Sequence, residues 1–411
     1  MKIWMKCTMF ALLSSIALCP EAMADENYTK AEEYLSEYCN VGPFSAEDGD
    51  PGAVNAALTA LGGEALKTET VDHEAVIAEG IRIAGLEELA QSYGNDADPT
   101  KADDVLEREG ATVENEEYAP YIACALDLGL IDLDMQGKED AEVFLYRCME
   151  ISGNGRHYIG RISDENILSE LRSALDGFEL FDNEILSELG TDIVLSGAAT
   201  GYSLKFSPYE AHFLDDYTIR YGHSDYQHAA QLVGLLKSKG MDGYVQLEPK
   251  VSVYEYLPEW GDPGEPTPTY KVKEEEDGRY LCYAMEYDMA IEFDSREEKE
   301  AFHSVIDDYA KKYDDRVDED GNVTAKLLAE SWWQPLYSSL APMENEEYGE
   351  LVDNTVYDST GMYSIHSFSV PEKAEEIAKM VEEDAPDLEV NRVTVYVNPA
   401  FIRYITGEDH Q

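Results

Sequence analysis

Apolar residues in the first third of the chain recur at helical spacing, and glycines end many of the apolar runs. Helices are expected in the order short, long, short, long, at 53–61, 72–84, 118–128 and 139–151. A shift of 67 residues places Gly62 on Gly129, which indicates an internal repeat whose units bury their apolar faces by stacking. We therefore predict a helical repeat module over 25–160, followed by a helical linker over 161–206.

The second half of the chain alternates helical and strand-like patterns. A helix is expected at 226–239, capped by Ser224-Asp225, before an alternating stretch at 243–256. From residue 279 the expected elements follow the order β-α-β-β-α-β, at 279–293, 295–313, 349–357, 362–369, 371–383 and 392–397. That order is typical of a ferredoxin-like domain, with another α+β sandwich as the alternative. The predicted fold class is α+β, with the helical module followed by an α+β domain over 207–411.

The first 24 residues have the features of a secretory signal. Lys2 and Lys6 precede an apolar run at 9–18, and Ala22-Met23-Ala24 matches an A-x-A cleavage site. The apolar run is too short for a permanent membrane anchor, and no later segment is long and apolar enough to span a membrane. We expect cleavage near Ala24 and a product that is secreted or held at the cell wall.

The charge balance excludes several classes of partner. The chain has 86 acidic and 30 basic residues, for a formal net charge of −56. Nucleic-acid binding depends on neutralising phosphates with Lys and Arg, so it is not expected. Binding to an anionic membrane surface is excluded for the same reason.

One stretch resembles a known family. Residues 117–131 read EYAPYIACALDLGLI, which is similar to the first helix of an S-layer homology repeat, and the likeness extends over about residues 50–153. The resemblance implies a helical, wall-binding module that uses a Thr-Arg pair. Here Val71-Asp72 and Lys138-Glu139 stand at the matching positions. A carboxylate repels an anionic sugar, so the expected wall binding is lost or altered unless divalent cations bridge the partners.

Four cysteines remain after the expected cleavage. They are Cys39, Cys124, Cys148 and Cys282, and none forms a C-x-x-C pair. Two disulfides in an oxidising compartment are one interpretation. The favoured interpretation is four small buried side chains. If one bridge exists, Cys39 with Cys124 or Cys148 is the first candidate.

Histidines and tryptophans are the remaining candidates for chemistry. His212, His223 and His228 are close in sequence, but the last two are five residues apart across an expected helix start and are not expected on one face. We therefore predict no metal site, no cofactor and no catalytic residue. Trp260, Trp332 and Trp333 are predicted to form a ligand surface, because aromatic faces stack on sugar rings.

These observations favour a non-enzymatic protein of the bacterial cell envelope with a recognition role. Its expected partner is a cell-wall polymer or an envelope protein. The alternative is a secreted hydrolase that acts on wall glycan or peptide through the 207–411 domain. Aligned carboxylates, or a His-Cys or His-Ser pair, in one deep cleft would favour the enzyme. Exposed Trp and Tyr on a shallow face, with no such pair, would favour binding.

Overall fold

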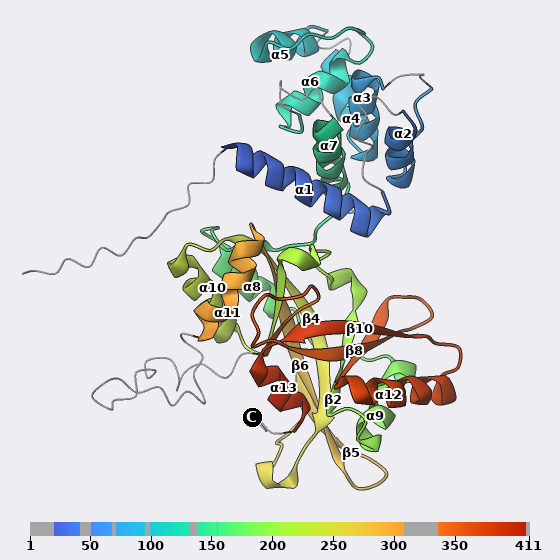
Figure 1. Ribbon diagram of the computed structural model, residues 1–411, viewed down its shortest axis with the longest axis vertical. Coiled ribbons are helices and arrows are strands. Elements are labelled where there is room, and N and C mark those ends of the chain that lie inside the picture. The colour runs from blue at the N-terminus through green and yellow to red at the C-terminus, as the bar shows by residue number, and fades with distance from the viewer. Residues whose placement is uncertain are drawn as a thin grey trace, which may run out of the picture. The chain divides into compact units, whose positions relative to one another are not determined.

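The computed structural model describes residues 20–41, 51–67, 71–94, 99–131, 138–153, 155–307 and 336–407. The chain divides into two compact units, Met1–Gly155 and Arg156–Gln411 (Figure 1). Trp332 and Trp333 lie outside the described residues, as does most of the expected signal segment. Within these described ranges, no helix is both long and apolar enough to span a membrane.

All the regular secondary structure described in the first unit is helical. The α-helices are α1 (Pro20–Cys39), α2 (Pro51–Ala60), α3 (His73–Ile83), α4 (Glu87–Gln91), α5 (Lys101–Glu109), α6 (Ala119–Asp127) and α7 (Lys138–Ile151). Helix α7 packs against α1 and α3, and α3 also packs against α6. Asp72 caps α3 by accepting a hydrogen bond from the Ala75 N–H at 3.2 Å. Helix α3 approaches α7 so closely at Gly80 that a Cβ atom there would lie 2.4 Å from the Phe144 ring.

Eight antiparallel strands of the second unit close into a barrel. Around the barrel the order is β4-β2-β9-β8-β10-β7-β3-β6, and β6 pairs with β4 to close it. The strands are β2 (Gly201–Phe206), β3 (Thr218–His223), β4 (Gly243–Glu255), β6 (Tyr280–Phe293), β7 (Leu336–Ser339), β8 (Gly349–Tyr357), β9 (Tyr363–Ser369) and β10 (Val390–Val397). Two further strands, β1 (Gly160–Arg161) and β5 (Tyr270–Glu274), pair with β4 and β6 respectively.

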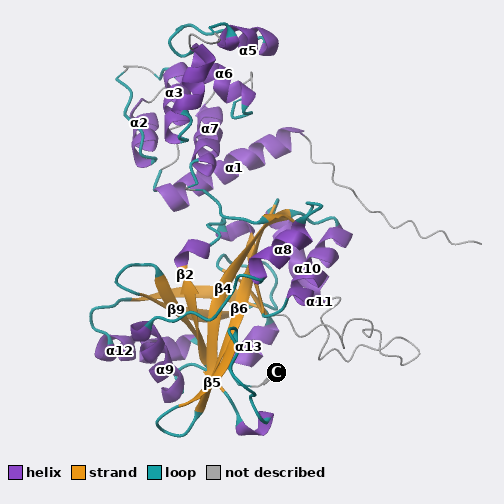
Figure 2. Ribbon diagram, turned by 180° about the vertical axis from the view of Figure 1, so that it is seen from behind, coloured by secondary structure: helices purple, strands orange, loops and turns teal. Residues whose placement is uncertain are grey.

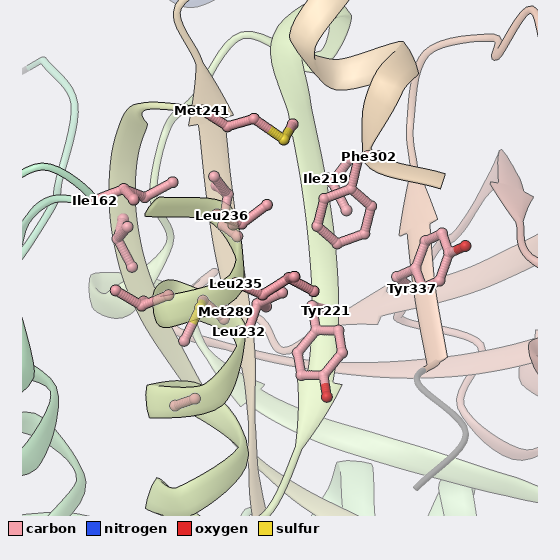
Figure 3. Close-up of a cluster of buried hydrophobic side chains, with 14 of the residues drawn as sticks. Ile162, Ile219, Tyr221, Leu232, Leu235, Leu236, Met241, Met289, Phe302 and Tyr337 are labelled. Atoms are coloured by element: carbon pink, nitrogen blue, oxygen red, sulfur yellow. The ribbon is translucent and has the colours of Figure 1, made fainter. Parts of the chain in front are cut away.

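Helices cover the outer face of the barrel (Figure 2). Apolar side chains of α8 (Ile167–Leu175), α10 (Tyr226–Lys239) and α11 (Arg296–Asp307) meet one side of the barrel in the cluster drawn in Figure 3. Helices α9 (Glu184–Ser196) and α12 (Pro371–Asp384) cover the other side through a second cluster. A last helix, α13 (Pro399–Ile405), contacts β7 and β8.

Side chains alternate between this apolar outer layer and the barrel interior. On β4, Val245 and Leu247 belong to the outer apolar cluster, whereas Gln246 and Glu248 take the alternate positions and are buried. The outer layer is therefore the main hydrophobic core, and the interior is largely polar.

The predicted fold class is wrong. The strands beyond residue 279 do not form a ferredoxin-like βαββαβ domain, since they complete a closed antiparallel barrel with strands from 201 onward. The expected arrangement of a helical repeat module plus an α+β domain is overturned by the same barrel. Residues 161–206, expected to be a helical linker, supply α8, α9 and the barrel strand β2. Because the barrel is closed, the polar side of each strand faces the interior. In the sequence, this side has the same period-two alternation as a side that faces solvent.

The four described cysteines are free thiols. Cys124, Cys148 and Cys282 are buried, and the Cys39 Sγ lies 2.9 Å from the Met149 Sδ. Burial raises the pKa of Cys124 to about 11. These thiols are therefore protonated at neutral pH and behave as small apolar side chains.

Candidate functional site

The interior of the barrel holds a compact network of opposite charges. The Nζ atoms of Lys205 and Lys250 lie 2.7 and 2.6 Å from the Asp288 carboxylate. Glu248 lies 3.7 Å from Lys205 and 3.7 Å from Arg220. Burial alone would raise the pKa of Asp288, but the two ammonium groups outweigh it and hold that pKa far below its usual range. The five side chains carry three positive and two negative charges, and Arg220 also lies 3.6 Å from the Asp215 carboxylate.

Three side chains on neighbouring strands β8 and β9 form a hydrogen-bonded chain. The His366 Nδ1 lies 2.7 Å from the Asp353 Oδ2, and its Nε2 lies 3.0 Å from the Ser364 Oγ. This is the connectivity by which a carboxylate orients an imidazole and the imidazole activates a serine. Ser364 has no exposed surface, and the His366 side chain is 13% exposed. The order of contacts is that of a serine nucleophile, but the hydroxyl is inaccessible.

A segment before β3 covers one end of the barrel. Ala211 and Phe213 pack on the buried Ala290 of β6. The backbone N–H of Ala211 donates to the Glu248 Oε1 at 3.0 Å, and the N–H of Leu214 donates to the Glu292 Oε2 at 3.0 Å. Two interior carboxylates thus hold this covering segment, residues 207–217, in place.

Apolar packing covers another part of the interior. Phe401 and Ile402 of α13 pack with buried Leu351, Val395 and Val397 from β8 and β10. Because Ser364 has no exposed surface, a substrate could reach it only if part of the structure around it moved.

Trp260 is the residue of the predicted ligand surface that lies within the described part of the chain. It lies in the short 3₁₀ turn Pro258–Trp260 after β4 and is 45% exposed. Its ring meets Tyr256 and Tyr254 edge-on, at centroid distances of 5.3 and 6.5 Å. The Tyr256 hydroxyl donates to the Gly261 carbonyl at 3.1 Å, which fixes the turn that carries the indole. We call Trp260, Tyr254 and Tyr256 the aromatic platform.

The structure brings two of the three candidate histidines together. His223 ends β3 and His228 lies in the first turn of α10, and their rings stack with centroids 3.8 Å apart. Asp225 lies between them in sequence and accepts from the His228 backbone N–H at 2.8 Å. His212 is elsewhere, with its ring 4.7 Å from the His157 ring.

Comparison with known proteins returns nothing for this chain. No protein-family model matches it, and neither the curated proteins nor the solved structures give a match.

Proposed function

We propose that the protein is an exported, non-enzymatic recognition protein of the bacterial cell envelope that contacts its ligand through the aromatic platform. The observation that carries the proposal is the half-exposed Trp260, which is held by two tyrosines on a hydrogen-bonded turn. A rigid aromatic face that is apolar and only partly buried is a feature of interface anchors. Export is proposed from the signal-like features of residues 1–24.

The charge around the platform narrows the ligand class. Glu259, Asp262 and Glu265 are exposed next to Trp260 in sequence. Carboxylates at the rim of an interface repel an anionic ligand and slow its association. The proposed ligand is therefore an uncharged part of a wall glycan, or an envelope protein with a neutral or basic face. An anionic wall polymer would need divalent cations between the two partners.

Replacing Trp260 with alanine is expected to weaken binding to purified sacculi at least about tenfold, because it removes the aromatic anchor. Binding is measured by co-sedimentation of the full chain over a range of salt, with calcium and with a chelator. Tyr209→Ala is the matched control, since Tyr209 is 41% exposed and its ring also contacts two aromatic rings, those of Phe178 and Phe206. Wild-type protein that ignores sacculi under every condition would contradict the proposal.

A second candidate is a secreted hydrolase, favoured by the Ser364–His366–Asp353 chain. In such an enzyme His366 would take the Ser364 proton during attack on a carbonyl, and Asp353 would stabilise the imidazolium. We rank it second because Ser364 is inaccessible.

A fluorophosphonate probe separates the two candidates. If the protein has only the recognition role, the folded wild type is expected to show no more labelling than Ser364→Ala. Labelling that disappears in Ser364→Ala, but persists in Ser367→Ala, would favour the hydrolase. Ser367 is the matched control because it is equally buried on the same strand and points to the other face.

A further inference from the structure

We infer that His223, Asp225 and His228 form a binding site for one divalent transition-metal ion of the zinc class. Each residue offers one ligand atom, and these atoms all lie within 4.8 Å of one another. Two imidazoles and a carboxylate are a donor set that suits zinc and its neighbours, whereas calcium and magnesium prefer oxygen ligands alone. Three protein ligands leave a fourth position for water or an exogenous group.

His228 supplies the independent evidence for a missing partner. Its side chain is 9% exposed, and its Nδ1 lies 2.6 Å from the Asp225 Oδ2. A proton on Nδ1 would be donated to that carboxylate, which leaves the lone pair on Nε2. The Nε2 atom is buried and has no hydrogen-bond partner in the described part of the chain. Leaving a buried acceptor unsatisfied is unfavourable, and a metal ion would satisfy it.

Helix capping explains only part of this arrangement. The Asp225 Oδ1 accepts the His228 backbone N–H, as an N-cap residue does. Capping does not require a histidine at 228, nor does it place a second imidazole against the first. The contact from Asp225 to the His228 Nδ1 is instead the one that orients a metal-binding imidazole and raises its basicity.

His223 supplies the second imidazole. Its Nδ1 accepts the Ser224 backbone N–H at 2.8 Å and lies 3.8 Å from the Asp225 Oδ2. Because the two rings are stacked, the His223 ring must turn before its lone pair points at an ion shared with His228. The Asp225 side chain is 48% exposed, which gives an ion access from solvent.

Calorimetric titration of the metal-free full chain with zinc chloride tests the site. We expect one site per chain that calcium chloride does not occupy at the same concentration. His223→Ala and His228→Gln are each expected to lower zinc affinity at least about tenfold, because each removes one of three ligands. Asp225→Asn should lower it by about 10–100-fold, since it replaces the carboxylate that is both the third ligand and the partner that orients His228. His212→Ala is the matched control and should leave the affinity unchanged.

One spectroscopic and one thermal measurement distinguish the loss of a ligand from misfolding of a variant. Cobalt(II) should give visible d–d absorption in the wild type that is lost in both histidine variants. Zinc should raise the melting temperature of the wild type and of His212→Ala only. The inference is overturned if wild type and His223→Ala, both shown to be folded by circular dichroism, bind zinc equally. It is also overturned if calcium competes equally, because the acidic surface would then be the binder. Neither result bears on Trp260 and sacculi, so the two proposals fail separately.

Discussion

Replacing Asp288 with asparagine is expected to destabilise the protein by about 3–5 kcal/mol, the usual cost of breaking a buried ion pair by removing one partner. The substitution keeps the size of the side chain but leaves Lys205 and Lys250 without the carboxylate that each contacts at 2.7 Å or less. Their side chains are only 14% and 13% exposed, so water cannot replace the lost charge. Glu248 is the nearest remaining carboxylate to Lys205, at 3.7 Å, and it is shared with Arg220.

The free energy of unfolding is measured by urea titration with circular dichroism as the readout. Glu376→Gln is the matched control, because Glu376 and Lys373 form an ion pair in which both side chains are nearly half exposed. Such a pair contributes at most about 1 kcal/mol. An Asp288→Asn variant as stable as this control would show that the interior charges are solvated and do not depend on one another.

The Asp288 carboxylate also predicts how the stability of the protein changes at acidic pH. The two ammonium groups hold the pKa of Asp288 far below its value in the unfolded chain. The stabilisation is therefore fully present above the unfolded value of about 3.9 and is lost as the pH falls below it. Lys205 is the opposite case, because its raised pKa gives stabilisation that is present at neutral pH and lost only in strong alkali. Unfolding below pH 4 should depend less on pH in Asp288→Asn than in the wild type.

Local elements of the second unit could be predicted from sequence because their signals lie within one segment. The expected strand at 349–357 and helix at 226–239 are confirmed with the same bounds, and the helix expected at 371–383 ends one residue later. Closure of the barrel could not be predicted, because it depends on the pairing of β4 with β6 and on β2, which lies in the expected linker. Polar and apolar residues alternate along a strand in the same way whether its polar face lies inside a barrel or in solvent.

The candidate sites were missed for related reasons. Ser364 and His366 are two residues apart in an expected strand, which places them on one face. Asp353 reaches His366 only through the pairing of β8 with β9, where Thr355 lies opposite His366. For His223 and His228, the five-residue spacing predicts that they do not share a helix face. The structure stacks them because His223 ends a strand and the chain turns at Ser224 before the helix begins.

Gly243→Ala and Gly234→Ala are expected to change stability in opposite directions. Gly243 begins β4, and a Cβ atom there would lie 2.4 Å from the Glu292 carbonyl oxygen on β6. Relieving that clash requires the backbone of the strand pair that closes the barrel to move, at a cost of about 1–3 kcal/mol or more. Gly234 is exposed in α10, and a methyl group added there would meet no described atom within 4 Å, so alanine should stabilise the helix by about 0.5–1 kcal/mol.

Urea titration of both glycine variants gives the two free energies on one scale. Neither glycine needs a left-handed backbone. The change in the free energy of unfolding therefore reflects two effects: the space around the added methyl group, and the lower conformational entropy of the unfolded chain. If Gly243→Ala is as stable as the wild type, β4 and β6 can separate without cost at that end. The strand pair that closes the barrel would then be a place where the barrel can open, and the inaccessibility of Ser364 would no longer count against the hydrolase.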